Sequence, residues 1–332
     1  MLKLVLKLLA LTTVLLGVKM AIWAYLHTYQ TRRFDESGYK LDSMLKPIRQ
    51  EINTVFVGSS RTAHSVNPAV FDSATQHQTR SFNHGISAMF APNTFAECEK
   101  LLKMDGLHLK TIFLELSFPP LKAHEDPFGR GNLFHEFSFK NSYFRREQNF
   151  GRERVQRGIT LYDSFLTHFI MLRSAILMLV ATVVRNDRDN FVMTPTGYRY
   201  FHPSAFLNRH YNRVSAQTPP DTTTLRVPFT ERDRFYVNRL MQLAQRCEAK
   251  NVAIYFYLPN RMMDEEKQTL PNIYAALPER YRISMPYRRQ FTPPFPADCS
   301  DDKQHLNQTA ATLYTQLFAQ AFLQKQPVTA TR

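Results

Sequence analysis

Short apolar runs alternate with stretches of helical periodicity along most of the chain. Runs rich in β-branched and aromatic residues, each ended by Gly, Pro or polar residues, predict buried strands at 54–58, 111–116 and 252–258. Apolar residues spaced three and four apart predict helices at 94–104, 232–250 and 307–323. Strands that are apolar along their whole length and alternate with helices are typical of a parallel sheet covered on both faces. We therefore expect an α/β fold.

The chain begins with a segment that is apolar enough to enter a membrane. Residues 8–25 read LLALTTVLLGVKMAIWAY, close to the ~20 residues that span a bilayer, and only Lys19 interrupts them. Lys3 and Lys7 precede the run, as expected for a cytoplasmic N-terminus. We expect 1–33 to be an uncleaved anchor with its flank. The alternative is a cleaved signal peptide, for which the run lacks a clear small-residue cleavage site.

The remaining residues, 34–332, are expected to form one α/β domain interrupted by a basic, aromatic-rich insertion at about 123–230. From Arg130 to Arg213 there are 13 basic and 6 acidic residues, a net charge of +7. Within it, 165–184 is strongly apolar but contains an Arg. An Arg at the centre of a membrane span costs about 2.5 to 3.5 kcal/mol. We therefore favour an amphipathic helix packed on the domain or lying at the membrane surface over a second span.

Charge narrows the choice of partner. The 332 residues include 42 Lys plus Arg against 28 Asp plus Glu, a net charge of +14, and the pI is about 9.7. Such a balance fits nucleic acid or an anionic surface. Both interpretations of the N-terminal segment place the domain outside the cytoplasm, so we expect no nucleic-acid partner. The basic insertion is either a docking face for an anionic polymer or lipid headgroup, or a solvated surface.

Cysteine and histidine spacing indicates neither a metal centre nor a disulfide framework. The chain has three Cys and no C-x-x-C pair. Cys98 and Cys247 fall on apolar faces of predicted helices and are expected to be buried thiols, and Cys299 could pair with either of them. Three histidines near the first strand show no spacing suited to a metal and are expected to be surface or hydrogen-bonded residues: His64, His77 and His84.

Candidate chemistry lies after the first strand and before the last helix. The first predicted strand ends in Gly58-Ser59-Ser60-Arg61, and ligands of open parallel sheets bind beyond the carboxyl ends of strands. A Ser hydroxyl needs an adjacent base, and the base needs an orienting acid. Asp302 and His305 lie three residues apart, so one loop can hold both side chains together. The simpler alternatives are a plain turn at Ser60 and helix N-capping at Asp302. No G-x-S-x-G elbow is present, which argues against an ordinary α/β-hydrolase.

A Ser after the first strand, combined with Asp-x-x-His before the final helix, resembles the SGNH (GDSL-like) hydrolase superfamily. This resemblance implies a three-layer, flavodoxin-like α/β domain in which Ser60 is the nucleophile, His305 the base and Asp302 the acid. Residues 81–86, SFNHGI, are similar to the second block of that family. The Gly of that block, here Gly85, supplies an oxyanion-hole N–H alongside the N–H of Ser60.

The third block of the family departs from the pattern. It normally contains Gly-x-Asn-Asp, whose Asn donates to the oxyanion, whereas residues 114–117 here read LELS. Asn83 is a candidate substitute donor, and Glu115 either lines the site or is a solvated or ion-paired carboxylate. The same loss occurs in membrane-anchored SGNH-like proteins of bacterial envelopes, including D-alanyl-transfer proteins of teichoic acids and acetylation proteins of exopolysaccharides.

This branch implies a single-pass protein of the bacterial inner membrane with a periplasmic or extracellular domain. The expected activity is that of a serine esterase or O-acyltransferase acting on an acylated envelope glycan or polymer through an acyl-enzyme. Water as acceptor gives an esterase and a sugar hydroxyl gives a transferase. The resemblance implies no cofactor and no metal, and a membrane-bound acyltransferase as partner. The alternative is a catalytically degenerate scaffold that binds polysaccharide or such a partner.

Overall fold

The protein is described by a computed structural model. It covers residues 2–34, 36–87, 89–91, 93–117, 176, 179, 191–201, 229–262, 264–284 and 305–325. The chain divides into two compact units. One unit combines Met1–Lys40 with Lys122–Arg188, and the other combines Leu41–Leu121 with Asp189–Arg332.

The first unit contains helix α1 (Leu2–Phe34), followed by the short helix α2 (Glu36–Gly38). Among the described helices, α1 is long and apolar enough to cross a membrane, over Leu2–Ile22. At a rise of about 1.5 Å per residue its 21 residues span about 31 Å, close to the ~30 Å of a hydrocarbon core. Large apolar side chains along it, including those of Leu9 and Val14, are exposed. The prediction of an N-terminal apolar helix is confirmed.

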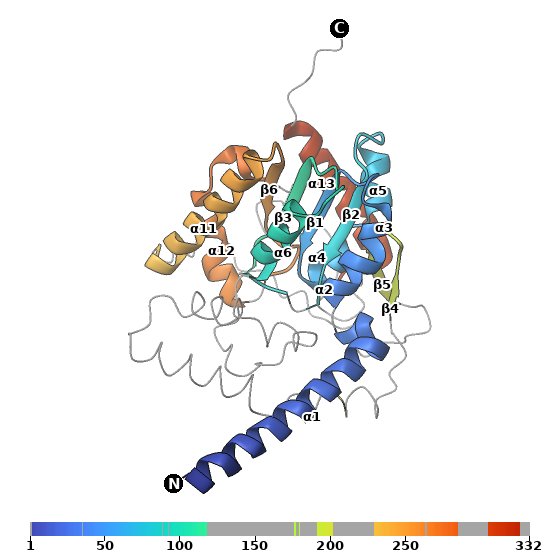
Figure 1. Cartoon of the computed structure of the whole chain (residues 1–332). Helices are drawn as coiled ribbons and strands as arrows, with labels where there is room; N and C mark the ends of the chain where they lie inside the picture. Colours follow the sequence, from blue (N-terminus) through green and yellow to red (C-terminus); the bar gives the residue numbers. More distant parts are fainter. Residues whose placement is uncertain are drawn as a thin grey trace, which may run out of the picture. The chain divides into compact units, whose positions relative to one another are not determined.

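A sheet of four parallel strands forms the centre of the second unit (Figure 1). The spatial order is β2-β1-β3-β6, with β1 (Thr54–Gly58), β2 (Ser81–Gly85), β3 (Thr111–Glu115) and β6 (Ala253–Tyr257). The three predicted strands are therefore confirmed to within one residue at each end. β2 was not predicted as a strand, because Asn83 and His84 interrupt its apolar pattern.

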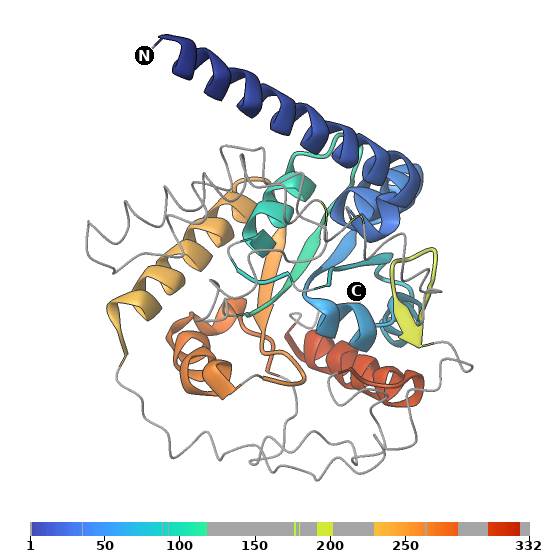
Figure 2. The same ribbon diagram turned by 90° about the horizontal axis from the view of Figure 1, so that it is seen from below.

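Helices cover both faces of this sheet, which confirms the expected α/β arrangement (Figure 2). Alternate strand residues point to opposite faces. Val55 and Ile112 pack with residues of α6 (Asn93–Leu102), α11 (Glu231–Glu248) and α12 (Asp264–Ala276). Phe56 and Phe113 stack at 4.8 Å and pack on the other face with α5 (Pro68–Ala74) and α13 (Gln308–Lys325).

Local sequence signals explain several boundaries. The helices predicted at 94–104, 232–250 and 307–323 are α6, α11 and α13. A capping box begins α11, because Thr230 accepts from the Asp233 N–H while Asp233 accepts from the Thr230 N–H.

As predicted, Cys98 and Cys247 are buried free thiols. The boundary between the two units falls within the π-helix η1 (Tyr39–Leu45), and the short elements α3 (Lys46–Ile48) and the 3-10 helix η4 (Glu279–Tyr281) belong to the second unit.

Part of the predicted insertion packs on the sheet domain. An antiparallel hairpin of β4 (Phe191–Met193) and β5 (Arg199–Phe201) lies within 123–230. The N–H of Asn83 on β2 donates to Thr196 O in the hairpin turn at 2.8 Å. A Cβ at Gly197 would meet Asn83 O at 2.2 Å, so only glycine allows this approach. The predicted helix at 165–184 lies outside the described residues except for positions 176 and 179.

Candidate functional site

Ser60 and His305, which the sequence analysis assigned as nucleophile and base, meet at the carboxyl edge of the sheet. Ser59 caps the short helix α4 (Ser60–Ser65) by accepting from the Arg61 N–H, so Ser60 is its first residue. His305 lies three residues before α13. Ser60 Oγ and His305 Nε2 are 2.8 Å apart, although 245 residues separate them in the chain. This is the contact through which an imidazole can take the proton of a hydroxyl. Asp302, the predicted acid, lies outside the described residues.

Two aromatic rings, those of His64 and Phe201, lie near the imidazole of His305. The ring of His64 lies 4.5 Å from that of His305 and stacks on Phe201 of β5 at 4.9 Å and 22°. The Phe201 and His305 rings are 6.2 Å apart. His64 follows Ser60 by four residues on α4, so both side chains lie on one helix face. The four-residue spacing from Ser60 could have indicated that His64 belongs to the site. The sequence contains no comparable signal for Phe201.

Two of the three predicted oxyanion donors form hydrogen bonds with other groups of the domain. The Gly85 N–H donates to Asn83 Oδ1 at 2.9 Å. The side-chain amide of Asn83 donates to Thr62 O at 2.8 Å and to Val66 O at 2.6 Å, which satisfies carbonyls at the end of α4. Gly85 and Asn83 therefore both donate within the fold in this structure, and their use as oxyanion donors stays a prediction. Within the described residues, the Ser60 N–H alone of the three donates no hydrogen bond.

Gly85 has a packing role as well. A Cβ at this position would meet the Ala63 N atom at 2.3 Å. The glycine therefore lets α4 lie directly against the end of β2, and it is this approach that brings the Asn83 amide within reach of the α4 carbonyls.

Glu115 at the end of β3 is a buried, ion-paired carboxylate rather than a solvated one. Its Oε1 lies 2.8 Å from Arg61 Nη2, and Arg61 Nη1 lies 2.5 Å from Oε2 of Glu266 on α12. All three residues are buried. Burial alone would lower the pKa of the Arg61 guanidinium, but the charges and hydrogen bonds of the two carboxylates raise it above its ordinary value. Neither Arg61 nor Glu266 was predicted from the sequence to contact this carboxylate.

The other two histidines near the first strand differ: His84 is buried in an ion pair and His77 is exposed. His84 Nε2 lies 3.0 Å from Oε2 of Glu97 on α6, and Lys100 Nζ donates to Glu97 Oε1 at 2.7 Å. Burial would raise the pKa of Glu97, but His84 and Lys100 lower it to about 2. His84 is thus hydrogen-bonded, as expected. His77 is exposed.

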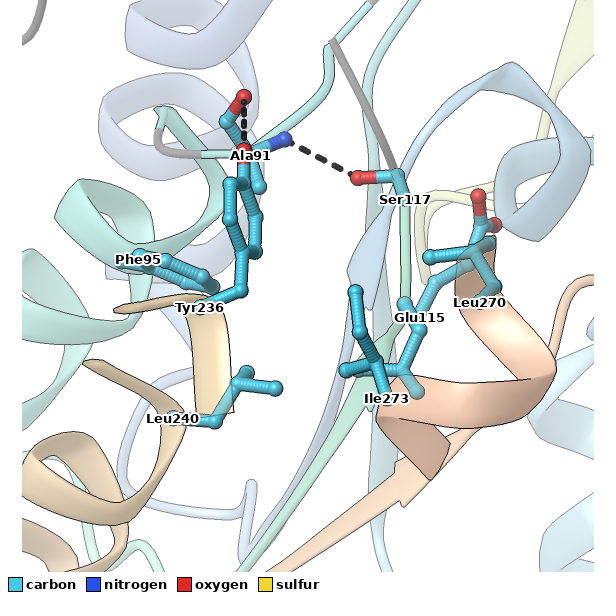
Figure 3. Close-up of a pocket in the computed structure, with 9 residues that line it drawn as sticks. Ala91, Phe95, Glu115, Ser117, Tyr236, Leu240, Leu270 and Ile273 are labelled. Carbon is cyan, nitrogen blue, oxygen red and sulfur yellow. Dashed lines mark hydrogen bonds between the residues drawn. The ribbon is translucent and has the colours of Figure 1, made fainter. Parts of the chain in front are cut away.

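A narrow cavity lies on the sheet face covered by α6, α11 and α12 (Figure 3). Phe95, Tyr236 and Leu270 line it, together with Glu115 and Ser117. The Ala91 N–H donates to Ser117 Oγ at 2.9 Å, and the Tyr236 hydroxyl donates to Ala91 O at 3.4 Å. Only about 10 Å³ is open to the centre of a water molecule, which is room for about one water. This cavity is too small to hold a substrate.

Comparisons with protein-family models, with curated proteins and with solved structures each gave no match to this chain. The described residues define a class of protein at the level of its architecture: a parallel α/β domain with a hydrogen-bonded Ser–His pair at the carboxyl edge of its sheet. Function is inferred from that geometry and from the sequence motifs.

Proposed function

We propose that this chain is a membrane-anchored, SGNH-like serine esterase or O-acyltransferase that acts on an acylated envelope glycan or polymer. The observation that carries the proposal is the 2.8 Å contact between Ser60 Oγ and His305 Nε2. The order of the first three strands, 2-1-3, supports a flavodoxin-like arrangement. Ser60 lies two residues after the end of β1, at the point where this order reverses, and ligands of doubly wound sheets bind there.

The proposed reaction proceeds in two acyl transfers. His305 Nε2 takes the proton of Ser60 as Oγ attacks the ester carbonyl of the donor. The C–O bond to the donor alcohol then breaks, and the imidazolium returns the proton to that alcohol, which leaves an acyl ester on Ser60. Water or a sugar hydroxyl then attacks this ester and gives its proton to His305. The bond between the acyl carbon and Ser60 Oγ breaks, the imidazolium returns the proton to Oγ, and the carboxylic acid or the acylated sugar leaves. The Ser60 N–H is the proposed oxyanion donor, and Asp302 is proposed to orient His305.

The location follows from helix α1. A 21-residue apolar helix of sufficient length supports an anchor in the bacterial inner membrane, with the α/β domain periplasmic or extracellular. A membrane-bound acyltransferase is the proposed source of the acyl group, and the basic insertion the proposed contact with an anionic surface.

A second candidate function is supported by a separate observation. The Gly85 N–H and the Asn83 amide are both used inside the fold, and the position of the missing Asn of the third block is near Glu115, which is ion-paired with Arg61. An oxyanion hole with fewer donors fits a non-catalytic SGNH-like scaffold that binds polysaccharide or a membrane partner.

A fluorophosphonate probe separates the two candidates. In this reaction Ser60 Oγ attacks phosphorus, fluoride leaves and the hydroxyl proton passes to His305. The full chain in neutral detergent is compared with Ser60→Ala and His305→Ala. The matched controls are Ser73→Ala and His108→Ala, both at exposed positions.

Labelling of the wild type and both controls, with loss in Ser60→Ala and His305→Ala, supports the acyl-enzyme. Absence of labelling in the wild-type chain, combined with retained binding to an acetylated polysaccharide, contradicts the enzymatic proposal and favours the scaffold.

A further inference from the structure

The turn that presents Ser60 is bound on both sides by one buried carboxylate. Glu115 Oε1 accepts from the Ser59 hydroxyl at 2.7 Å, and Oε2 accepts from the Thr62 N–H at 3.1 Å. Oε2 also accepts from the Thr62 hydroxyl at 2.5 Å. Glu115 therefore contacts residues immediately before and shortly after Ser60, while Ser60 Oγ itself contacts His305.

Close packing at the end of β1 makes these contacts short. A Cβ at Gly58 would meet Thr62 Oγ1 at 2.1 Å and Glu115 Cβ at 2.7 Å. Glycine at this position is therefore required for the carboxylate of β3 to reach the first turn of α4. The Tyr257 hydroxyl at the end of β6 lies 2.7 Å from Thr62 Oγ1 and extends the network across a further strand.

Arg61 and Glu266 hold the carboxylate from the other side. Arg61 Nε and Nη2 both donate to Glu115 Oε1, at 3.1 and 2.8 Å, and Nη2 also donates to Glu266 Oε1 at 3.0 Å. Arg61 Nη1 donates in addition to Arg261 O at 2.7 Å, just before α12. The guanidinium thus joins α4, β3 and the start of α12, so Glu115 has little freedom to move.

Stability alone does not account for a buried charge network at this position. Well-packed apolar residues of similar volume are often as stable as a buried ion pair, or more so. The carboxylate instead accepts from five donor atoms of three residues next to or near Ser60: the Ser59 hydroxyl, Nε and Nη2 of Arg61, and the N–H and hydroxyl of Thr62. Apolar residues could not accept any of these hydrogen bonds.

We propose that Glu115, held by Arg61 and Glu266, is a positioning residue that sets the backbone around Ser60 and thereby directs its Oγ toward His305. This inference rests on the proposed function, because it concerns a nucleophilic Ser60. An error of about 1 Å in the placement of reacting groups can cost about a hundredfold in rate. The loss of this carboxylate should therefore lower the reactivity of Ser60 far more than it lowers the stability of the domain.

The test uses the full chain in neutral detergent. It measures the second-order rate constant of fluorophosphonate labelling, together with kcat and KM for p-nitrophenyl acetate. Glu115→Gln replaces one acceptor oxygen by an NH₂ group that faces donors. Thr62→Val removes one hydrogen bond of the carboxylate, together with the contact between the Thr62 and Tyr257 hydroxyls, and keeps the side-chain shape. Glu97→Gln is the matched control, since Glu97 is also a buried, ion-paired carboxylate but contacts His84 and Lys100.

We expect Glu115→Gln to label at least tenfold more slowly and to lose kcat with KM unchanged. Thr62→Val should lose three- to tenfold, and Glu97→Gln should stay within twofold of the wild type. Three outcomes overturn the inference: labelling of folded Glu115→Gln or of Thr62→Val within twofold of the wild type, or an equal loss in Glu97→Gln. If Glu115→Gln fails to fold, Thr62→Val decides. A wild-type chain that does not label overturns the proposed function and this inference with it, and so differs from every other outcome.

Discussion

Lowering the pH should lower the free energy of unfolding, because Glu97 becomes protonated. The folded-state pKa of Glu97 is about 2, against an ordinary value of 4.5. Between these values the unfolded chain binds a proton that the folded chain does not, so the stabilisation is complete above about pH 4.5 and is lost as the pH falls toward 2. A pKa difference of about 2.5 corresponds to about 3 kcal/mol of unfolding free energy, because each tenfold change in the proton-binding constant contributes about 1.4 kcal/mol.

The structure shows where this free energy originates. His84 and Glu97 are both buried, so their interaction is weakly screened by solvent. The Lys100 side chain is 42% exposed, so its share is smaller, and about 3 kcal/mol is an upper value. Glu97→Gln removes the titrating group and keeps a side chain of the same shape.

Urea unfolding of the full chain in neutral detergent, followed by far-UV circular dichroism between pH 6 and 2.5, measures the effect. The wild type should lose up to about 3 kcal/mol more of its unfolding free energy across this range than Glu97→Gln does. Glu51→Gln, at an exposed carboxylate, should follow the wild type. Equal pH dependence in the wild type and Glu97→Gln would refute the reasoning.

Three further predictions concern packing and burial. Gly85→Ala places a Cβ 2.3 Å from a backbone nitrogen of α4, so the free energy of unfolding should fall by about 1 to 3 kcal/mol in the same urea assay. Burial raises the pKa of Cys98, and raises that of Cys247 to about 12, so both thiols should react with iodoacetamide at pH 8 only after unfolding, as counted by mass spectrometry. Thr315→Val leaves the Asn67 N–H without its acceptor at 3.0 Å and should cost about 1 to 3 kcal/mol in thermal or urea unfolding.

Each of these has a control in the same chain. Gly17→Ala introduces a Cβ with nothing within 4 Å and should leave unfolding unchanged. A Cys299→Ser background restricts the thiol count to the two buried cysteines, and rapid native labelling of either would contradict their burial. Thr312→Val removes an exposed hydroxyl that bonds within α13, to Gln308 O. An equal loss of stability in Thr312→Val and Thr315→Val would show that the contact with Asn67 adds nothing to the free energy of unfolding.

The strands and helices that follow one simple pattern were predictable. β1, β3 and β6 are apolar runs, and α6, α11 and α13 repeat their apolar residues at helical spacing. β2 and α12 follow no such pattern. Asn83 and His84 interrupt β2, and Pro271 lies inside α12. Their conformations depend on contacts with distant parts of the chain, such as the bond between His84 and Glu97 on α6.

The site divides in a similar way. The sequence was enough to single out Ser60, His305 and Asp302, because motif order and spacing are properties of the chain itself. It named Gly85 and Asn83 as oxyanion donors but gave no indication that both donate hydrogen bonds within the fold. It assigned no role in the site to His64, and it could not reveal Glu266, which contacts Arg61 although 205 residues separate them in the chain.

By itself, the sequence determined which segments are buried in the sheet, which segment is apolar enough for a membrane, and which side chains are chemically able to form a Ser–His pair. Tertiary structure decided that Ser60 and His305 meet across 245 residues and that Glu115 binds the turn around Ser60. The physical reason is the range of the interactions involved. Apolar burial depends on the local pattern of side chains, whereas a hydrogen bond depends on the position of two atoms to within a few tenths of an ångström, and only the packed fold sets that.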